Sequence, residues 1–335
     1  MQNANTARSS ATAPRGGLWS TPLPLIGCEV AHSGISVARW SRRSALLDAV
    51  AWRPLAPGAL EASPLRENIQ RPADIEKAMG DALRSLGVDP GASAQRPIEA
   101  FMVIPDQAAR LSVLSFETFP KRAAEGLPLV KWRLKKSLPF DIDSAAISYF
   151  VERSGKEMQV VAVAAPRTVV GQYEAMAQRF GLRPKWVTLS TLAALELAAG
   201  GAKDGPEGIL VAKYSPPWFT TAILQGGMLR LFRTVGITAG EDGSLPVADA
   251  LSSVYPSVAY FQDNFQGTIA RAYLCGLGAN TASVAEGLER ELELKSGPLV
   301  PDVSRLVAGG GAGADAFAAE RNFTSLVGIA REQNG

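Results

Sequence analysis

Two stretches of the chain, one starting near residue 25 and the other near residue 208, open with the same pattern of strands and turns. Short strand-like runs follow one another with turns between them, which predicts hairpins. The predicted strands are 25–30, 35–40 and 44–52 in the first stretch and 208–214, 219–225 and 228–235 in the second. Helices follow the strands in both stretches, so the sequence predicts two similar α/β lobes. A chain of 335 residues is long enough for two or three packed subdomains.

A smaller unit is predicted between the two lobes. Its strands are expected at 98–104, 111–119, 145–152 and 158–164, and its helices at about 126–137 and 167–180. The first two strands end at Pro105 and Pro120, and the second helix stops at Gly181, because these residue types interrupt regular structure. The mixture of strands and helices predicts an α+β unit.

The composition excludes several classes of protein. The 34 basic residues are balanced by 32 acidic ones, so the net charge of +2 gives no general reason to bind nucleic acid. Hydrophobic residues make up 47% of the chain, which is typical of a globular protein. The most apolar runs, near 160–165 and 192–199, are far shorter than the ~20 residues of a membrane-spanning helix. Residues 1–17 are polar and lack the apolar core of a signal peptide, so we expect a disordered tail.

Cysteine and histidine are too scarce for several kinds of site. Cys28 and Cys275 lie far apart in the sequence, so a disulfide framework is excluded and a reducing compartment is expected. We interpret both thiols as small buried apolar groups rather than nucleophiles. A zinc site with several histidines cannot be built, because His32 is the single histidine. A Ser-His-Asp triad would need His32 itself, which we interpret as a solvated turn residue.

Six segments, spread from about residue 25 to residue 332, occur in the order and spacing of one known family. They are Gly27–Ser33, Trp132 with Leu138–Phe140, Val161–Pro166, Gly181–Pro184, Gly276–Ala279 and Phe323–Ala330. Together they resemble the motifs of the type IV pilus assembly protein PilM family, a member of the actin-like ATPase superfamily. The segment formed by Trp132 and Leu138–Phe140 is the most distinctive match.

The resemblance implies an α/β chain with the actin-like ATPase fold, in which two RNase H-like lobes carry a small inserted α+β domain similar to SHS2 domains. The implied division is a tail at 1–17, a first lobe at 18–96, an inserted domain at 97–185, and a second lobe at 186–335 with a closing helix that returns to the first lobe. It further implies a cytoplasmic protein, peripheral to the inner membrane, that grips the tail of the inner-membrane protein PilN between the first lobe and the inserted domain. The cytoplasmic domain of the type II secretion protein GspL is a near relative, so a role in that system is an alternative.

The phosphate-binding segments depart from the family pattern. In the first hairpin, Glu29 stands where the family has Asp and Ala31 where it has Gly. In the second hairpin, residues 212–217 (Ala-Lys-Tyr-Ser-Pro-Pro) lack the expected acid, and their two prolines have no N–H to offer a phosphate. Without that acid the site lacks a carboxylate to hold the Mg²⁺ that orients the phosphates, so we expect no ATP hydrolysis. Lys213 could meet a phosphate as a point charge, but the favoured interpretation is a solvated or strand-edge lysine.

The third segment keeps Gly276 and Gly278 ahead of a predicted helix at 281–293, which suits an anion or adenosine but also occurs for purely structural reasons. The residues expected to line a degenerate nucleotide site are Glu29, Ser33, Gly276, Gly278 and Ala279. We predict no catalytic residue, no metal and no required cofactor, with bound ATP and Mg²⁺ as the alternative.

Residues 131–136 (Lys-Trp-Arg-Leu-Lys-Lys) form a basic run where the family usually has acids. One interpretation is contact with anionic headgroups of the inner leaflet. The favoured interpretation is a solvated helix face with Trp132 turned into the core.

The sequence therefore predicts a scaffold of the pilus assembly machine, a pseudo-ATPase rather than an enzyme. Two other interpretations stay open: an active ATPase or sugar-kinase-like phosphotransferase on the same fold, and a filament-forming actin homologue. Both need a working nucleotide site, and the departures at Glu29 and 212–217 argue against one.

Overall fold

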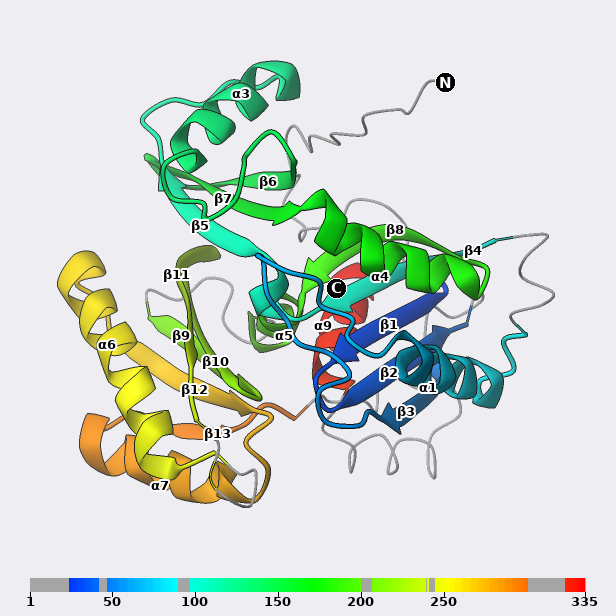
Figure 1. Ribbon diagram of the computed structural model, residues 1–335. Helices are drawn as coiled ribbons and strands as arrows, with labels where there is room; N and C mark the ends of the chain where they lie inside the picture. Colours follow the sequence, from blue (N-terminus) through cyan, green and yellow to red (C-terminus); the bar gives the residue numbers. More distant parts are fainter. Residues whose placement is uncertain are drawn as a thin grey trace.

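The computed structural model describes residues 24–41, 47–89, 97–199, 207–238, 240, 245–300 and 323–334. Figure 1 shows two larger sheets with their helices and a third, smaller sheet at one end of the molecule. The tail predicted at 1–17 lies outside the described residues. Within the described ranges no helix is both long and apolar enough to cross a bilayer.

The first lobe is built on a five-stranded sheet with the strand order β3-β2-β1-β4-β8. Its strands are β1 (Ile26–Ala31), β2 (Gly34–Trp40), β3 (Leu47–Pro54), β4 (Ile98–Ile104) and β8 (Leu182–Leu189). The first three form an antiparallel meander, whereas β4 runs parallel to β1 and β8 runs parallel to β4. Helix α1 (Pro72–Ser85) packs against β2 and β3. It starts at a proline and is followed by Gly87 at φ 71°, as the sequence predicts.

The second lobe repeats this strand order. Its sheet runs β11-β10-β9-β12-β13, with an antiparallel meander followed by two parallel strands. The strands are β9 (Gly208–Ser215), β10 (Trp218–Gln225), β11 (Met228–Gly236), β12 (Ile269–Cys275) and β13 (Ser296–Pro298). Helices α6 (Val247–Phe265) and α7 (Thr281–Leu292) pack against each other, and both contact this sheet. The recurring hairpin pattern in the sequence therefore corresponds to two lobes of the same topology.

The inserted unit has its own three-stranded sheet and its own small core. Strands β5 (Arg110–Ser115), β6 (Ala145–Ser154) and β7 (Glu157–Pro166) form an antiparallel sheet in the order β5-β7-β6. Helix α3 (Ala123–Leu134) packs on it through Val130 and Leu134, which are buried beside Phe119 and Val160. Helix α4 (Arg167–Arg179) then leads back into β8 of the first lobe.

The boundaries predicted for the inserted domain need correction. The prediction placed 97–185 in that domain, but β4 begins at Ile98 and pairs with β1, and β8 continues past residue 185 beside β4. Both strands belong to the first lobe, so the strands of the insertion lie between Arg110 and Pro166. The sequence could not decide this, because a strand's sheet is set by its pairing partner, which lies far away in the chain.

The inserted unit is bound to the second lobe as well as the first. The backbone N–H of Leu229 on β11 donates to the Glu152 carboxylate at 3.0 Å, and Gln159 donates to the Leu229 carbonyl at 2.7 Å. Arg230 also forms an ion pair with Glu157 at 2.7 Å. Burial raises the pKa of Glu152 above its ordinary value, although the hydrogen bonds that its carboxylate accepts from Gln159 and Leu229, and the charge of Arg230, work in the opposite direction. The insertion is thus a bridge between the lobes.

Two helices join the lobes at the centre of the molecule. Helix α5 (Ser190–Ala199) follows β8 and is almost completely buried, and helix α9 (Thr324–Asn334) closes the chain against α5 and β1 (Figure 1). One continuous apolar core includes first-lobe residues, residues of both helices, and Ile209, Val211 and Ala222 of the second lobe. Because the lobes share this core, they cannot separate without exposing apolar surface to water.

The close approach of α9 to α5 generates a testable prediction. A Cβ atom at residue 328 would lie 1.9 Å from the carbonyl oxygen of Ala193, so Gly328→Ala cannot be accommodated without moving the helices. We expect a loss of about 1–3 kcal/mol in the free energy of unfolding, measured by urea denaturation.

Gly171→Ala is the matched control, because a Cβ at this position on α4 meets open space. We expect no loss there and a gain of up to ~1 kcal/mol, since alanine favours a helix over glycine. Equal midpoints for Gly328→Ala and the wild type would contradict the close packing.

Candidate functional site

A cavity of about 330 Å³ lies between the two lobes. It is bordered by the end of β1 and its turn from the first lobe, and by the end of β9, its turn and the segment after β12 from the second. All five residues predicted for the degenerate nucleotide site line it: Glu29, Ser33, Gly276, Gly278 and Ala279. The structure therefore brings together residues that are up to 250 positions apart.

In the segment 276–279, packing of the chain explains why residue 276 is a glycine. Gly276 has φ 72°, and a Cβ there would lie 2.2 Å from the Tyr214 carbonyl oxygen, so only glycine fits where β12 ends beside β9. Gly278, at φ 59°, begins the turn that leads into α7 and has open space around it. The packing of the two strands thus accounts for Gly276 without any ligand.

Glu29 projects from β1 into the space between the lobes. Its side chain is only 6% exposed, and its Oε1 atom accepts hydrogen bonds from the hydroxyls of Ser190 at 2.5 Å and Ser325 at 3.0 Å. These serines are at the first position of α5 and the second position of α9. The two central helices therefore begin at this carboxylate.

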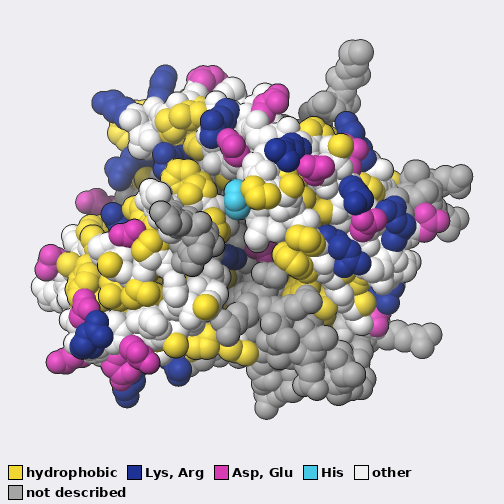
Figure 2. All heavy atoms as spheres, turned by 60° about the horizontal axis from the view of Figure 1, so that its bottom comes forward, with side chains coloured by type: hydrophobic (Ala, Val, Ile, Leu, Met, Phe, Trp, Pro, Cys, Tyr) yellow, Lys and Arg dark blue, Asp and Glu magenta, His cyan; other side chains and the backbone are white. Residues whose placement is uncertain are grey.

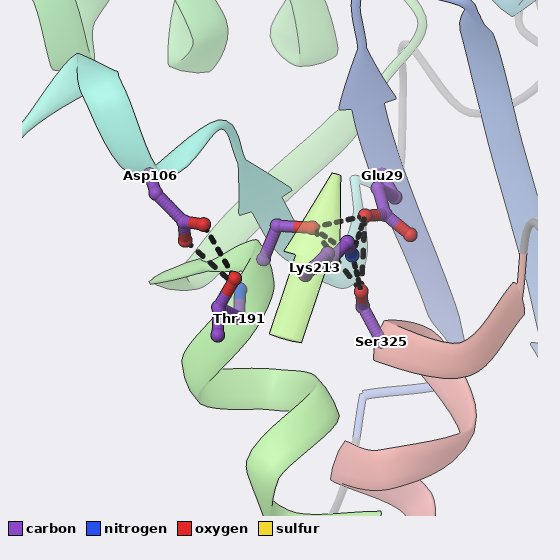
Figure 3. Close-up of polar contacts among 6 residues, drawn as sticks. Glu29, Asp106, Thr191, Lys213 and Ser325 are labelled. Atoms are coloured by element: carbon purple, nitrogen blue, oxygen red, sulfur yellow. Dashed lines mark hydrogen bonds and ion pairs between the residues drawn. The ribbon is translucent and has the colours of Figure 1, made fainter. Parts of the chain in front are cut away.

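Lys213 completes the cluster from the opposite lobe (Figure 3). Its ammonium lies 3.3 Å from Glu29 Oε1, donates to Ser325 Oγ at 2.6 Å, and also donates to Ser190 Oγ. The side chain is 12% exposed, so the preferred expectation of a solvated or strand-edge lysine is wrong. Four elements, β1, α5, β9 and α9, meet at this one polar cluster.

The position of Lys213 follows from the pleat of β9. This strand pairs with β10 on one side and β12 on the other, so it has no free edge. The neighbours Ala212 and Tyr214 point into the core of the second lobe, and Lys213 therefore points the other way, toward the first lobe. The continuous apolar run Ile209–Ala212 just before Lys213 was the signal that could have indicated a strand covered on both faces.

The electrostatic surroundings keep Lys213 charged. Burial alone would lower the pKa of its ammonium, but attraction, chiefly to Glu29 and also to Asp106, outweighs it and raises the pKa above the ordinary value. Lys213 is therefore a cation at neutral pH. A buried ion pair with hydrogen bonds to two hydroxyls is a well-satisfied arrangement, whereas either charge alone in this place would be costly.

Asp106 is a half-buried residue with an engaged carboxylate, and sequence reasoning missed it. It follows Pro105 at the end of β4 and accepts hydrogen bonds from the backbone N–H of Thr191 at 2.9 Å and from its hydroxyl at 2.5 Å (Figure 3). Burial raises the pKa of this carboxyl, although Thr191 and the charge of Lys213 oppose the shift. Asp106 is thus engaged at the N-terminus of α5, where an acid stabilises the helix.

The histidine and the cysteines have no nucleophilic environment. His32 is half-buried in the turn after β1, and its Nδ1 lies 3.1 Å from the carbonyl oxygen of Leu60. In Figure 2 the histidine is the cyan side chain near the middle of the face shown. Cys28 and Cys275 are buried and unpaired, and burial raises the pKa of each thiol to about 12. Both remain protonated at neutral pH, as expected for apolar core residues.

Comparison with known proteins defines the fold. No family model and no curated protein matches the chain. A chain of the PilM-PilN type IV pilus biogenesis complex superposes with a TM-score of 0.75 and 17% identity, over 92% of this chain and 98% of that one. A Bacteroides thetaiotaomicron protein with an actin-like ATPase fold and unknown function superposes with a TM-score of 0.50 and 7% identity, over 90% of this chain and 94% of that one. The chain has the actin-like ATPase fold. The predicted fold class is confirmed, and so, at the level of fold, is the resemblance to PilM.

The residues of the cleft do not fit the magnesium and nucleotide that this fold implies. Glu29 is the one carboxylate among the described residues that line the cavity, and its Oε1 already accepts from two hydroxyls and an ammonium. The described parts of the chain contain no cluster of three or more potential metal ligands. The turn after β9 is formed by Pro216 and Pro217, which present no N–H to a phosphate. A divalent cation beside Glu29 would also have to displace the charge of Lys213.

A second cavity, of about 450 Å³, lies on the other side of the same proline turn. Its lining is mainly apolar and includes Leu60, Pro105, Pro217 and Trp218, together with His32 and Arg66. The loop that carries Leu60 and Arg66 is held to α4, because Gln172 accepts from the backbone N–H of Asn68 at 2.8 Å and Tyr173 donates to the Asn68 side chain at 2.9 Å. This cavity is therefore preformed.

The basic run on α3 differs from the favoured prediction. Trp132 is 72% exposed and does not turn into the core. Val130 and Leu134 occupy the buried face of α3, and a residue between them on the helix faces away. The sequence could not decide which of the apolar residues of this helix would face the small sheet.

The buried ion pair predicts a strong coupling between the lobes. Lys213→Met should lower the free energy of unfolding by about 3–5 kcal/mol, because it leaves a buried carboxylate without its cation. Adding Glu29→Gln should recover most of that loss, since the amide removes the charge. Urea denaturation of the wild type, both single variants and the double variant gives the coupling energy.

Lys131→Met is the matched control for this cycle. Lys131 pairs with Asp143 at 3.5 Å in an exposed position, so we expect a change below about 1 kcal/mol. Equal and small effects of Lys131→Met and Lys213→Met would contradict a buried ion pair between the lobes.

The raised pKa of Lys213 also predicts how stability changes with pH. A lysine whose pKa is higher in the folded than in the unfolded chain stabilises fully below the unfolded value of about 10.4, and this contribution is lost as the pH rises through the folded value. The stability difference between the wild type and the Lys213→Met, Glu29→Gln double variant should therefore shrink above that pH. Urea denaturation in a series of alkaline buffers measures it, and a constant difference would count against the assignment.

Proposed function

We propose that this chain is a cytoplasmic scaffold of a type IV pilus assembly machine that binds the cytoplasmic tail of a PilN-like inner-membrane protein and does not hydrolyse ATP. The observation that carries the proposal is the superposition on a chain of the PilM-PilN complex with a TM-score of 0.75 over 92% of this chain. The order and spacing of the six sequence segments support it independently of the superposition.

The cleft chemistry supports the absence of hydrolysis. Metal-assisted phosphoryl transfer needs carboxylates that hold a cation and backbone donors that hold phosphates. Here the carboxylate of Glu29 holds an internal cation, the ammonium of Lys213, at 3.3 Å. The prolines of the second hairpin remove donors from the place where a phosphate would lie.

We infer that Lys213 connects the two lobes, as a bound nucleotide does in an active actin-like ATPase. It links β9 of the second lobe to β1 of the first and to the starts of α5 and α9. The shared apolar core and the contacts of the inserted unit with Leu229 act in the same direction. Such a chain holds one shape without a ligand, which suits a protein that positions other proteins.

The second cavity is our candidate for the site of the partner's tail. It lies where the loop around Leu60 in the first lobe meets Pro105, at the connection to the inserted unit. Its preformed, mainly apolar wall suits the apolar side chains of an extended peptide. The sequence alone had named no residue for this groove.

Fluorescence anisotropy of a labelled peptide tests the proposal. The peptide is the N-terminal cytoplasmic tail of the PilN-like protein from the same genome, titrated with the full chain without and with Mg-ATP. We expect saturable binding with the same Kd in both conditions, because Lys213 already pairs with Glu29, the one carboxylate in the described lining of the cleft. Binding that needs Mg-ATP would overturn the pseudo-ATPase assignment, and no binding in either condition would overturn the PilN-like partner.

A cavity-filling variant locates the tail site. Ala62→Trp places a large side chain in the wall of the second cavity and should weaken peptide binding by tenfold or more, about 1.4 kcal/mol. Ala73→Trp, at an exposed position on α1 outside both cavities, is the control and should leave the Kd unchanged. Equal affinities of the two variants would place the tail elsewhere.

A further inference from the structure

We propose that the outer face of α3 rests on an anionic lipid bilayer, as a membrane contact separate from the tail site. The face is defined by Pro128, Leu129 and Trp132, all of them exposed, with the basic residues Lys135 and Lys136 after them. Trp132 is 72% exposed and Leu129 39% exposed, and they lie three residues apart on the helix, so they share one side of it. Large apolar side chains exposed together in this way indicate a contact surface.

The charge around this face is mainly positive. Residues 121–136 contain six basic residues and a single acid, Glu125, although the whole chain has a net charge of only +2. Three of the basic residues have partners within the unit: Arg122 lies 3.8 Å from Glu125, Lys131 lies 3.5 Å from Asp143, and Arg133 lies over the Phe116 ring. In the described residues no ion pair engages Lys121, Lys135 or Lys136, which are all exposed.

The shape of the region favours a bilayer over a protein or peptide partner. Figure 1 shows α3 at the outer end of the inserted unit, on the side of the small sheet away from the two lobes. A peptide binds best in a groove or along a free strand edge, whereas this face is the outer side of a projecting helix. A projecting apolar strip that ends in tryptophan and is bordered by lysines fits the interface of a membrane, where indole rings and lysines are both stabilised.

The helix can present this face without rearranging. Val130 and Leu134 are fully buried and hold α3 to the small sheet. The three-stranded sheet is in turn bound to the second lobe through Glu152, Gln159 and Arg230. A bilayer that contacts Trp132 would therefore orient the whole molecule, because α3 is connected to both lobes through the small sheet. This contact does not depend on binding of the partner's tail.

Sedimentation of the full chain with vesicles tests the proposal. The vesicles are made of phosphatidylcholine alone or with a fraction of phosphatidylglycerol. We expect binding to the anionic vesicles that weakens as salt is added, because each basic residue near a charged surface contributes roughly fivefold to the binding constant. Wild-type protein that sediments no better with anionic than with neutral vesicles at low salt overturns the proposal and leaves an acidic protein as the partner of α3.

Variants assign the binding to this face. Lys135→Glu with Lys136→Glu should weaken anionic binding by about tenfold or more. The control reverses two exposed lysines outside the inserted unit, Lys77→Glu on α1 with Lys295→Glu before β13, which gives the same net charge, and should change binding by less than about twofold. Equal losses in the two pairs would mean that only the net charge matters and would overturn the assignment.

The wavelength of tryptophan emission reports on the surroundings of Trp132 and does not depend on the net charge of the protein. The emission of the wild type should shift to the blue when anionic vesicles are added, as the exposed indole of Trp132 enters the interface. Trp132→Phe should abolish that shift while the chain keeps its circular dichroism spectrum. An unchanged shift in Trp132→Phe would show that this indole does not meet the lipid.

Discussion

The ammonium of Lys213, the carboxylate of Glu29 and the hydroxyls of Ser190 and Ser325 form a polar cluster at which both lobes and both central helices meet. A buried charge is tolerated only when its partner and its hydrogen bonds are in place. The cluster therefore constrains the relative positions of β1, β9, α5 and α9 at once. Apolar contacts in the shared core supply most of the burial, but they are not directional, whereas this cluster requires one register of the two lobes.

The same cluster links the fold to the proposed function. In the actin-like ATPase fold the cleft between the lobes is the place for a nucleotide, whose charge is held from both sides. In this chain a lysine supplied by the second lobe meets a glutamate supplied by the first, so the lobes attract each other without a ligand. The inserted unit strengthens the connection, because it hydrogen-bonds to β11 of the second lobe while its chain begins and ends in the first. The proposed scaffold role uses this connection, because linked lobes present their surfaces to partners in one arrangement.

Both proposed contact surfaces depend on this rigidity. The cavity at Leu60 and Trp218 is formed by segments of both lobes, so its shape is fixed by their relative position. Trp132 lies on a helix that is tied to the small sheet, and the sheet is tied to the second lobe. A partner's tail in the cavity and a bilayer against α3 would therefore be held at a fixed distance and angle from each other.

The sequence by itself determined most of the helices and strands and the absence of backbone donors at residues 216 and 217. Alternation and turn residues predicted the strands of both hairpin sheets within a few residues, and the prolines at 216 and 217 fixed the loss of backbone donors, because these properties are local. The five residues predicted for the cleft also meet around one cavity. Only the tertiary structure decided that Lys213 pairs with Glu29, that β4 and β8 belong to the first lobe, and that Trp132 faces outward. Each of these depends on which distant segment lies opposite a residue, and a charge or an apolar ring is stable or unstable according to that neighbour rather than to its own place in the chain.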